Sequence, residues 1–170
     1  MSLTTAQLTT LKADILADPA FALIPNDPDG AFQIAVVYNT IVAPDFWIWR
    51  TSVGQLEIVT ATSQDATDWS WPIYIARSAA ERDCWREMFA DGGSVNAALP
   101  NVRQGFQDIF SGAGGAAQRT HLLAVTRRKA TRVEKLFAVG TGTTISPATS
   151  EFLDGFTLSY TDVQTARNLP

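Results

Sequence analysis

The sequence predicts a mostly α fold, with one compact helical domain that ends in an extended C-terminal arm containing a short strand. Over much of the first 139 residues, apolar residues recur at spacings of three and four. Residues that favour helix starts precede these periodic stretches. Gly, Thr, Ser and Pro dominate directly after residue 139. These observations divide the chain into a helical body, residues 1–139, and an arm, residues 140–170.

Two helices are expected near the N-terminus. The first is capped by Thr4 or Thr5 and has an apolar face of residues three and four apart, namely Leu8, Leu11 and Ile15. The second is capped by Asp27 or Asp29 and covers residues 31–39. That run is rich enough in β-branched residues to resemble a strand, but its Asp-capped start favours a helix.

Further helix starts follow along the body. They are the Ser52–Gln55 capping box, the Ser78–Glu81 capping box, Pro100 in a first turn, and Ala116. The segment from Ser63 to Tyr74 is left open between a loop that packs aromatic rings and a short extended stretch. The helix from Ala116 to Thr126 continues as one helix or two through Phe137, with Gly140 as its C-cap.

The arm contains one alternating segment. Phe156, Leu158 and Tyr160 are separated by small polar residues, and this period of two predicts a strand over residues 156–160. A lone strand needs an edge to pair with, so we expect it to add to another subunit. Residues 162–167 are left open between one helical turn and coil.

The charge is unevenly distributed. The net charge of −4 arises from −7 in residues 1–100 (12 acids, 5 bases) and +3 in residues 101–170 (5 acids, 8 bases). This division suits head-to-tail packing between neighbouring subunits. The alternative interpretation is that each face is simply solvated.

A basic segment runs from Arg127 to Lys135 and is expected to be helical. Its cations are Arg127, Arg128, Lys129, Arg132 and Lys135, with Glu134 the one acid among them. Three interpretations are open: a solvated face, a docking face for an acidic partner or neighbouring subunit, and a contact with nucleic acid. The acidic net charge argues against nucleic acid.

Catalytic and cofactor sites are not expected. Cys84 and His121 are each the single residue of their type. A catalytic cysteine–histidine pair is therefore less favoured than a buried or half-buried structural thiol at Cys84 and a position for His121 on or near the core face of its helix. The carboxylate pairs Asp27/Asp29 and Asp65/Asp68 lie where caps and turns favour acids. We therefore expect neither an enzyme nor a cofactor or metal site.

Tryptophan is frequent, and the five residues are Trp47, Trp49, Trp69, Trp71 and Trp85. Acidic neighbours argue against stacking on nucleic-acid bases, so core or interface packing is favoured. No apolar run has signal-peptide or membrane-spanning length. We expect no membrane contact and synthesis in a cytoplasm.

Several segments carry a resemblance to a known family. They are Phe46–Val53, Trp85–Phe89, Asn101–Phe110, Arg127–Phe137, Gly140–Gly142, Ser146–Thr149 and Phe156–Tyr160. Through them, residues 1–167 resemble a family of small structural proteins of tailed bacteriophages. These motifs are specific to the family and encode no known activity.

The resemblance implies a virion subunit at the head–tail junction, as in connector (adaptor or head-completion) proteins. Such proteins form rings, commonly of about twelve copies, on the portal protein through a C-terminal arm. Partner-binding residues would then be the five cations together with Phe156, Leu158 and Tyr160. Other neck or tail proteins are further partners, and incidental contact with packaged DNA is also expected. The alternative is a head decoration or minor capsid protein on the shell.

Overall fold

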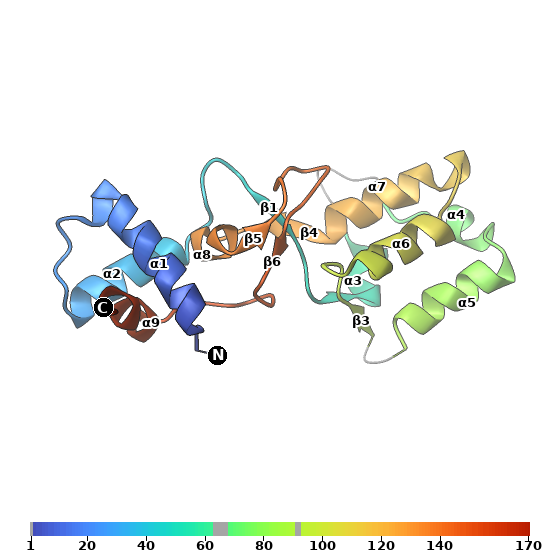
Figure 1. Ribbon diagram of the computed structural model, residues 1–170. Helices are drawn as coiled ribbons and strands as arrows, with labels where there is room; N and C mark the ends of the chain where they lie inside the picture. Colours follow the sequence, from blue (N-terminus) through green and yellow to red (C-terminus); the bar gives the residue numbers. More distant parts are fainter. Residues whose placement is uncertain (1, 63–67, 91–92) are drawn as a thin grey trace.

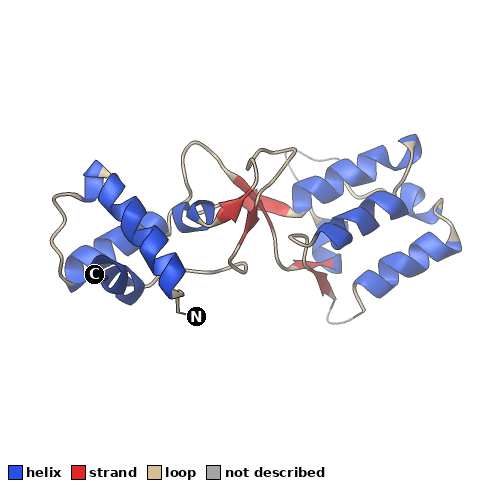
Figure 2. Ribbon diagram, in the orientation of Figure 1, coloured by secondary structure: helices blue, strands red, loops and turns tan. Residues whose placement is uncertain are grey.

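The computed structural model describes residues 2–62, 68–90 and 93–170. Helices predominate, and the strands form short two-stranded antiparallel pairs. Figure 1 shows an elongated molecule with a group of helices at each end and strands between them. Figure 2, coloured by secondary structure, shows the same division. The prediction of a mostly α fold is confirmed.

The elements have the following bounds. The helices are α1 Thr5–Ala17, α2 Pro28–Tyr38, α3 Gln55–Thr60, α4 Trp71–Ile75, α5 Ala79–Met88, α6 Pro100–Ile109, α7 Ala116–Val125, α8 Arg132–Leu136 and α9 Tyr160–Arg167. The strands are β1 Trp47–Trp49, β2 Val53–Gly54, β3 Ser94–Val95, β4 Arg127–Lys129, β5 Ala138–Val139 and β6 Thr149–Ser150. The pairs are β1 with β4, β2 with β3, and β5 with β6.

Most predicted helix starts are confirmed. Thr4 forms a capping box at α1, Asp27 accepts a hydrogen bond from the Gly30 N–H at α2, and Ser78 forms a capping box at α5. Pro100 lies in the first turn of α6. The Ser52 box is wrong, because Gly54 precedes α3 and the Ser52 N–H donates to Asp154 instead.

The first lobe joins the two ends of the chain. Helices α1, α2 and α9 pack around one core that also receives residues from α8 and from the segment before α9. Buried members include Leu11, Ile34, Tyr38, Val133 and Val163. The last helix therefore completes a core that the first two helices begin.

The second lobe is built from the middle of the chain. Helices α3 to α7 surround Trp85, which is almost fully buried and contacts the rings of Trp69, Phe89, Phe106 and Phe110. The chain enters this lobe after β1 and leaves it before β4. The lobe, residues 50–126, is thus inserted between two strands that pair with each other (Figure 1).

The strands between the lobes form a neck. In the register of β1 and β4, Ile48 is opposite Arg128. The Ala148 N–H donates to Trp47 O, and the Trp49 N–H donates to Ala148 O, both at 2.9 Å. Ile48, Ala130 and Ala148 make a small buried cluster there. Three segments distant in sequence therefore meet in the neck.

The prediction of a continuous basic helix is wrong. Residues 127–129 are strand β4, and the short helix α8 begins only at Arg132. Two interactions interrupt the predicted helix. Residues 127–129 pair with β1, and Thr131 and Glu134 form a capping box that starts a new helix at Arg132. Gly140 is not the helix C-cap either, because α8 ends at Leu136 with Phe137 as its cap.

The prediction of a strand over residues 156–160 is also wrong. Leu158 is buried, and both its backbone N–H and its C=O bond to the side chain of Asn39. Phe156 stacks on Phe152 with ring centroids 3.9 Å apart. The alternation therefore reflects an extended segment that packs against the first core and pairs with no strand of the described residues.

The C-terminal arm has more structure than expected. Residues 140–159 form an irregular segment with bends, a turn at residues 154–155 and the short strand β6, but Tyr160–Arg167 forms helix α9, which is capped by Ser159 and Asp162. Val163 and Ala166 of α9 are fully buried. The end of the arm is thus part of the first lobe.

This packing predicts that α9 is needed for the first lobe to fold. Val163→Ala should lower the free energy of unfolding by about 2 kcal/mol, because it removes buried apolar volume. Thr165→Ala on the exposed side of the same helix should change it by less than about 0.5 kcal/mol. Urea unfolding followed by circular dichroism measures both, and equal small effects would contradict the packing.

Candidate functional site

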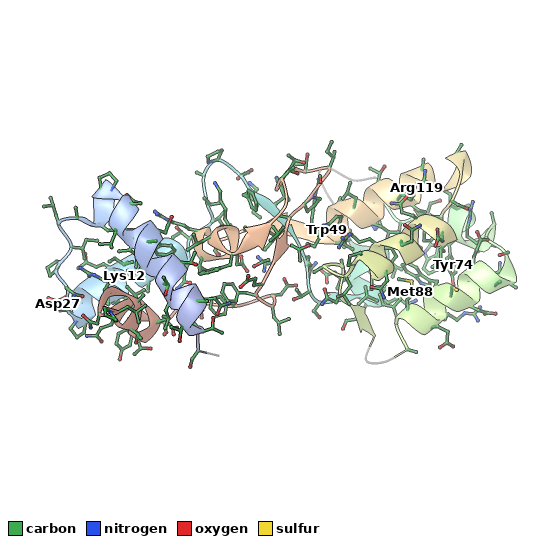
Figure 3. All side chains as sticks on the ribbon, viewed as in Figure 1. Lys12, Asp27, Trp49, Tyr74, Met88 and Arg119 are labelled. Carbon is green, nitrogen blue, oxygen red and sulfur yellow. The ribbon has the colours of Figure 1, made fainter. Side chains whose placement is uncertain are left out.

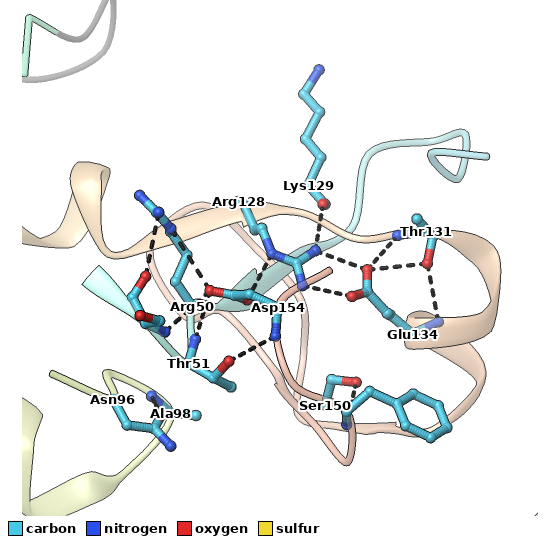
Figure 4. A network of polar contacts seen from close by, with 12 residues as sticks. Arg50, Thr51, Asn96, Ala98, Arg128, Lys129, Thr131, Glu134, Ser150 and Asp154 are labelled. Carbon is cyan, nitrogen blue, oxygen red and sulfur yellow. Dashed lines mark hydrogen bonds and ion pairs between the residues drawn. The ribbon is translucent and has the colours of Figure 1, made fainter. Parts of the chain in front are cut away.

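The predicted basic residues are each held by neighbours within the chain. Arg128 Nη1 and Nη2 donate to the two carboxylate oxygens of Glu134 at 2.8 and 2.5 Å, and Nε donates to Asp154 at 2.9 Å (Figure 4). The hydrogen bonds to Glu134 outweigh burial and raise the pKa of Arg128. Arg128 is thus the centre of a polar network in the neck.

The same network fastens the arm to the second lobe. The Asp154 carboxylate accepts from the backbone N–H groups of Thr51 and Ser52 at 3.0 and 3.1 Å. The Asp154 N–H in turn donates to Thr51 Oγ1 at 2.7 Å. Glu134 also accepts from Thr131, so one chain of contacts runs from the start of the second lobe to α8 (Figure 4).

Arg132 joins α8 to α1. Its Nη1 donates to Asp18 at 2.6 Å and its Nη2 to Asp14 at 3.1 Å. The guanidinium lies over the rings of Phe21 and Tyr38, at 5.0 and 4.7 Å from their centroids. Burial and the hydrogen bond to Asp14 raise the pKa of the Tyr38 hydroxyl.

The other three cations lie on aromatic rings of the neck. Arg127 and Lys129 approach the Trp47 ring at 4.8 and 5.8 Å, and Lys135 approaches Phe46 at 5.5 Å. Lys129 also pairs with Asp45 at 2.8 Å. Lys129 and Lys135 are exposed, whereas the arginines are half-buried. A partner-binding role for the five cations stays a prediction, with the two lysines the accessible members.

The predicted residues of the arm have different surroundings. Leu158 is buried in the first core, Phe156 is half-buried, and Tyr160 at the start of α9 is 46% exposed. The structure does not bring these three together with the five cations into one site. Of the three, Tyr160 is the most accessible to a partner.

Candidate catalytic residues lie apart from one another. Cys84 is exposed on α5, contrary to the expectation of a buried or half-buried thiol. His121 is fully buried in the second lobe, and its Nε2 lies 2.7 Å from Ile58 O. Asp27 and Asp29 lie at the start of α2, as a cap and a first-turn acid. Asp65 lies outside the described residues. Within the described ranges, no three potential metal ligands cluster.

The tryptophans are used mainly for packing. Trp69 and Trp85 are in the second core, and Trp47 and Trp49 are half-buried in the neck. Trp71 is the exception, with 53% of its surface exposed. Along the described chain, no helix is long and apolar enough to cross a membrane.

Two surfaces were not anticipated from the sequence. Helix α2 exposes Phe32, Val36 and Val37, with Phe32 59% accessible, on the side opposite its buried face. An open groove of about 440 Å³ lies between α6 and α7, with Trp49 and Ile145 at its edge. Helix α2 is apolar on both sides, a sequence signal that points to a second packing surface.

Comparison with known proteins gives no family assignment. No protein-family model, no curated protein and no solved structure matches the chain.

The Arg128 network yields a prediction about stability. Glu134→Ala leaves a half-buried guanidinium without its bidentate partner and should lower the free energy of unfolding by about 3 kcal/mol. Glu134→Gln, which keeps an acceptor for Thr131, should cost less. Glu87→Ala at an exposed position is the control, with a change below about 0.5 kcal/mol. Chemical denaturation tests all three, and a Glu134→Ala value no larger than the control would refute the network.

The ion pair between Asp18 and Arg132 predicts how stability depends on pH. The Ala20 N–H and Arg132 lower the pKa of Asp18. A carboxyl group whose pKa is lower in the folded than in the unfolded protein stabilises the folded state at pH values above its unfolded-state pKa. This stabilisation is lost as the pH falls toward the folded-state pKa. The free energy of unfolding should therefore decrease below about pH 4, and less steeply in Asp18→Asn. Urea unfolding across that range, with Asp83→Asn as an exposed control, measures the slopes. Identical slopes in all three proteins would contradict this.

Proposed function

We propose that this chain is a structural subunit of a tailed-bacteriophage virion, at the head–tail junction, where it forms a ring on the portal protein. The resemblance of its sequence motifs to small structural proteins of tailed bacteriophages supports this proposal. The exposed apolar face of α2 is the observation that carries the assembly role, because subunits of assemblies keep such faces for neighbours.

The fold refines the proposed portal contact. Since α9 belongs to the first lobe, the portal would be contacted by the non-helical part of the arm, residues 140–157. Ile145 and Leu153 in that segment are 81% and 65% exposed. Exposed apolar side chains on a surface segment suit docking onto a second protein.

Copy number per particle tests this proposal. Quantitative mass spectrometry of purified virions, scaled to the major capsid protein, should give about twelve copies if the protein forms a ring on the portal. Hundreds of copies would instead favour a decoration or minor capsid protein on the shell. Absence from the particle would overturn the virion role altogether.

The contact itself is tested separately. Leu153→Asp should reduce incorporation into particles at least tenfold, because it places a charge in an apolar contact. Leu56→Asp is the matched control, since Leu56 is 74% exposed on α3 in the second lobe. Normal incorporation of Leu153→Asp would exclude the arm as the portal contact.

A further inference from the structure

The groove between α6 and α7 has a mixed lining. Phe106, Leu122 and Leu123 provide an apolar floor, and the Trp49 ring forms one wall. A second hollow continues along α7 past Ile145 to Arg127. Helices of ten residues border the groove on both sides, so it has room for about 15 Å of a partner helix.

The groove is strongly basic. Arg103, Arg119 and Arg127 line the two hollows, and none of the described lining residues is acidic. Asp108 of α6 lies in a different hollow, shared with α5. Unlike Arg128 and Arg132, these three arginines have no ion pair among the described residues.

Backbone carbonyls fix two of these arginines in place. Arg103 Nη1 donates to Ala97 O and Ala98 O at 2.7 and 2.8 Å, and its guanidinium lies 4.8 Å from the Trp49 ring. Arg119 Nη1 donates to Gly112 O at 2.9 Å. These contacts hold the side chains without neutralising them. The groove is therefore preorganised for an apolar partner that carries negative charge.

Helix α2 and its flanking residues complement the basic, apolar groove, because they combine negative charge with an exposed apolar face. Residues 13–49 contain five aspartates and no lysine or arginine. Asp14, Asp18 and Asp45 pair with Arg132 or Lys129. Asp27 and Asp29, at the start of α2, have no ion pair among the described residues, and Phe32, Val36 and Val37 follow them on the exposed side.

We infer that the exposed face of α2 in one copy docks into the α6–α7 groove of the next copy. The apolar side chains lie on the groove floor, with Phe32 as the central anchor, and Asp29 faces the arginines. This is a helix-in-groove contact with anchors one turn apart. An aromatic anchor in a pocket rimmed by charge is typical of interface hot spots.

Pairing of two α2 faces with each other fits less well. Both helices would present Asp27 and Asp29 and carry no cation of their own, so like charges would meet. The two surfaces also lie in different lobes, with Asp27 at one end of the molecule and Trp49 and Arg119 toward the other (Figure 3). Contacts between unlike surfaces join copies head to tail, and a suitable rotation closes them into a ring.

This inference rests on the proposed function, since it names the surfaces of the proposed ring, but purified protein alone tests it. Sedimentation velocity should show that the wild type self-associates as concentration rises. Phe32→Asp should weaken association at least tenfold through loss of the anchor. Thr120→Glu, at an exposed groove position, should do the same by bringing a carboxylate toward Asp29. Leu56→Asp should associate like the wild type.

Mixing the two defective variants tests the pairing of surfaces directly. Phe32→Asp keeps an intact groove and Thr120→Glu keeps an intact α2 face, so the mixture should form a one-to-one dimer although each variant alone is monomeric. Circular dichroism confirms that each is folded. Absence of the mixed dimer would overturn the inference, and so would a wild type that stays monomeric at all concentrations.

The two proposals fail in different ways. A monomeric wild type that is nevertheless present at about twelve copies per particle would remove only the α2–groove contact. A self-associating protein absent from particles would remove only the virion role.

Discussion

The antiparallel pairing of β1 with β4 governs the architecture, because the chain enters and leaves the second lobe through these two strands. Three residue pairs alone make a short ladder, and isolated two-stranded ribbons are marginal in water. The neck is reinforced from two sides. The backbone of Ala148 forms hydrogen bonds to both ends of β1. On β4, the Arg128 side chain binds the carboxylates of Glu134 and Asp154. Ladder and ion pairs together fix where one lobe lies relative to the other.

The basic residues divide into two groups by their surroundings. Arg128 and Arg132 have acidic partners and aromatic or backbone neighbours inside the fold, so their charge serves cohesion. Arg103 and Arg119 are held by carbonyls and face an open groove that has no acid among its described lining. Arg128 and Arg132 belong to the most basic segment of the sequence, residues 127–135, whereas Arg103 and Arg119 lie outside it. The density of positive charge along the sequence therefore does not identify the groove as the surface best suited to an acidic partner.

Helix α2 carries two sets of apolar residues, one buried in the fold and one exposed. Ile34, Ala35 and Tyr38 of α2 are buried against α1 and α9, while Phe32, Val36 and Val37 point away from them. A helix that is apolar all round needs two packing surfaces. The chain supplies one through its own C-terminal helix α9, and the other is exposed, where the proposed contact with a second copy would cover it.

Helix starts could be predicted from the sequence because a capping box is a local interaction within four residues. Ser78–Glu81 acts as predicted, and Thr4, one of the two predicted caps of the first helix, forms a box with Gln7. Thr131–Glu134 and Ser159–Asp162 carry the same local signal, but the apolar periodicity around them predicted a continuous helix and a strand instead.

The sequence alone determined the helical class, most helix starts and the burial of His121 and Trp85. Only the tertiary structure decided that residues 127–129 form a strand, since the ladder partner lies about eighty residues earlier in the chain. It also decided that Leu158 packs inward and that Arg132 binds acids 114 and 118 residues away. Contacts at such separation leave no local periodicity, because only the folded chain brings their partners together.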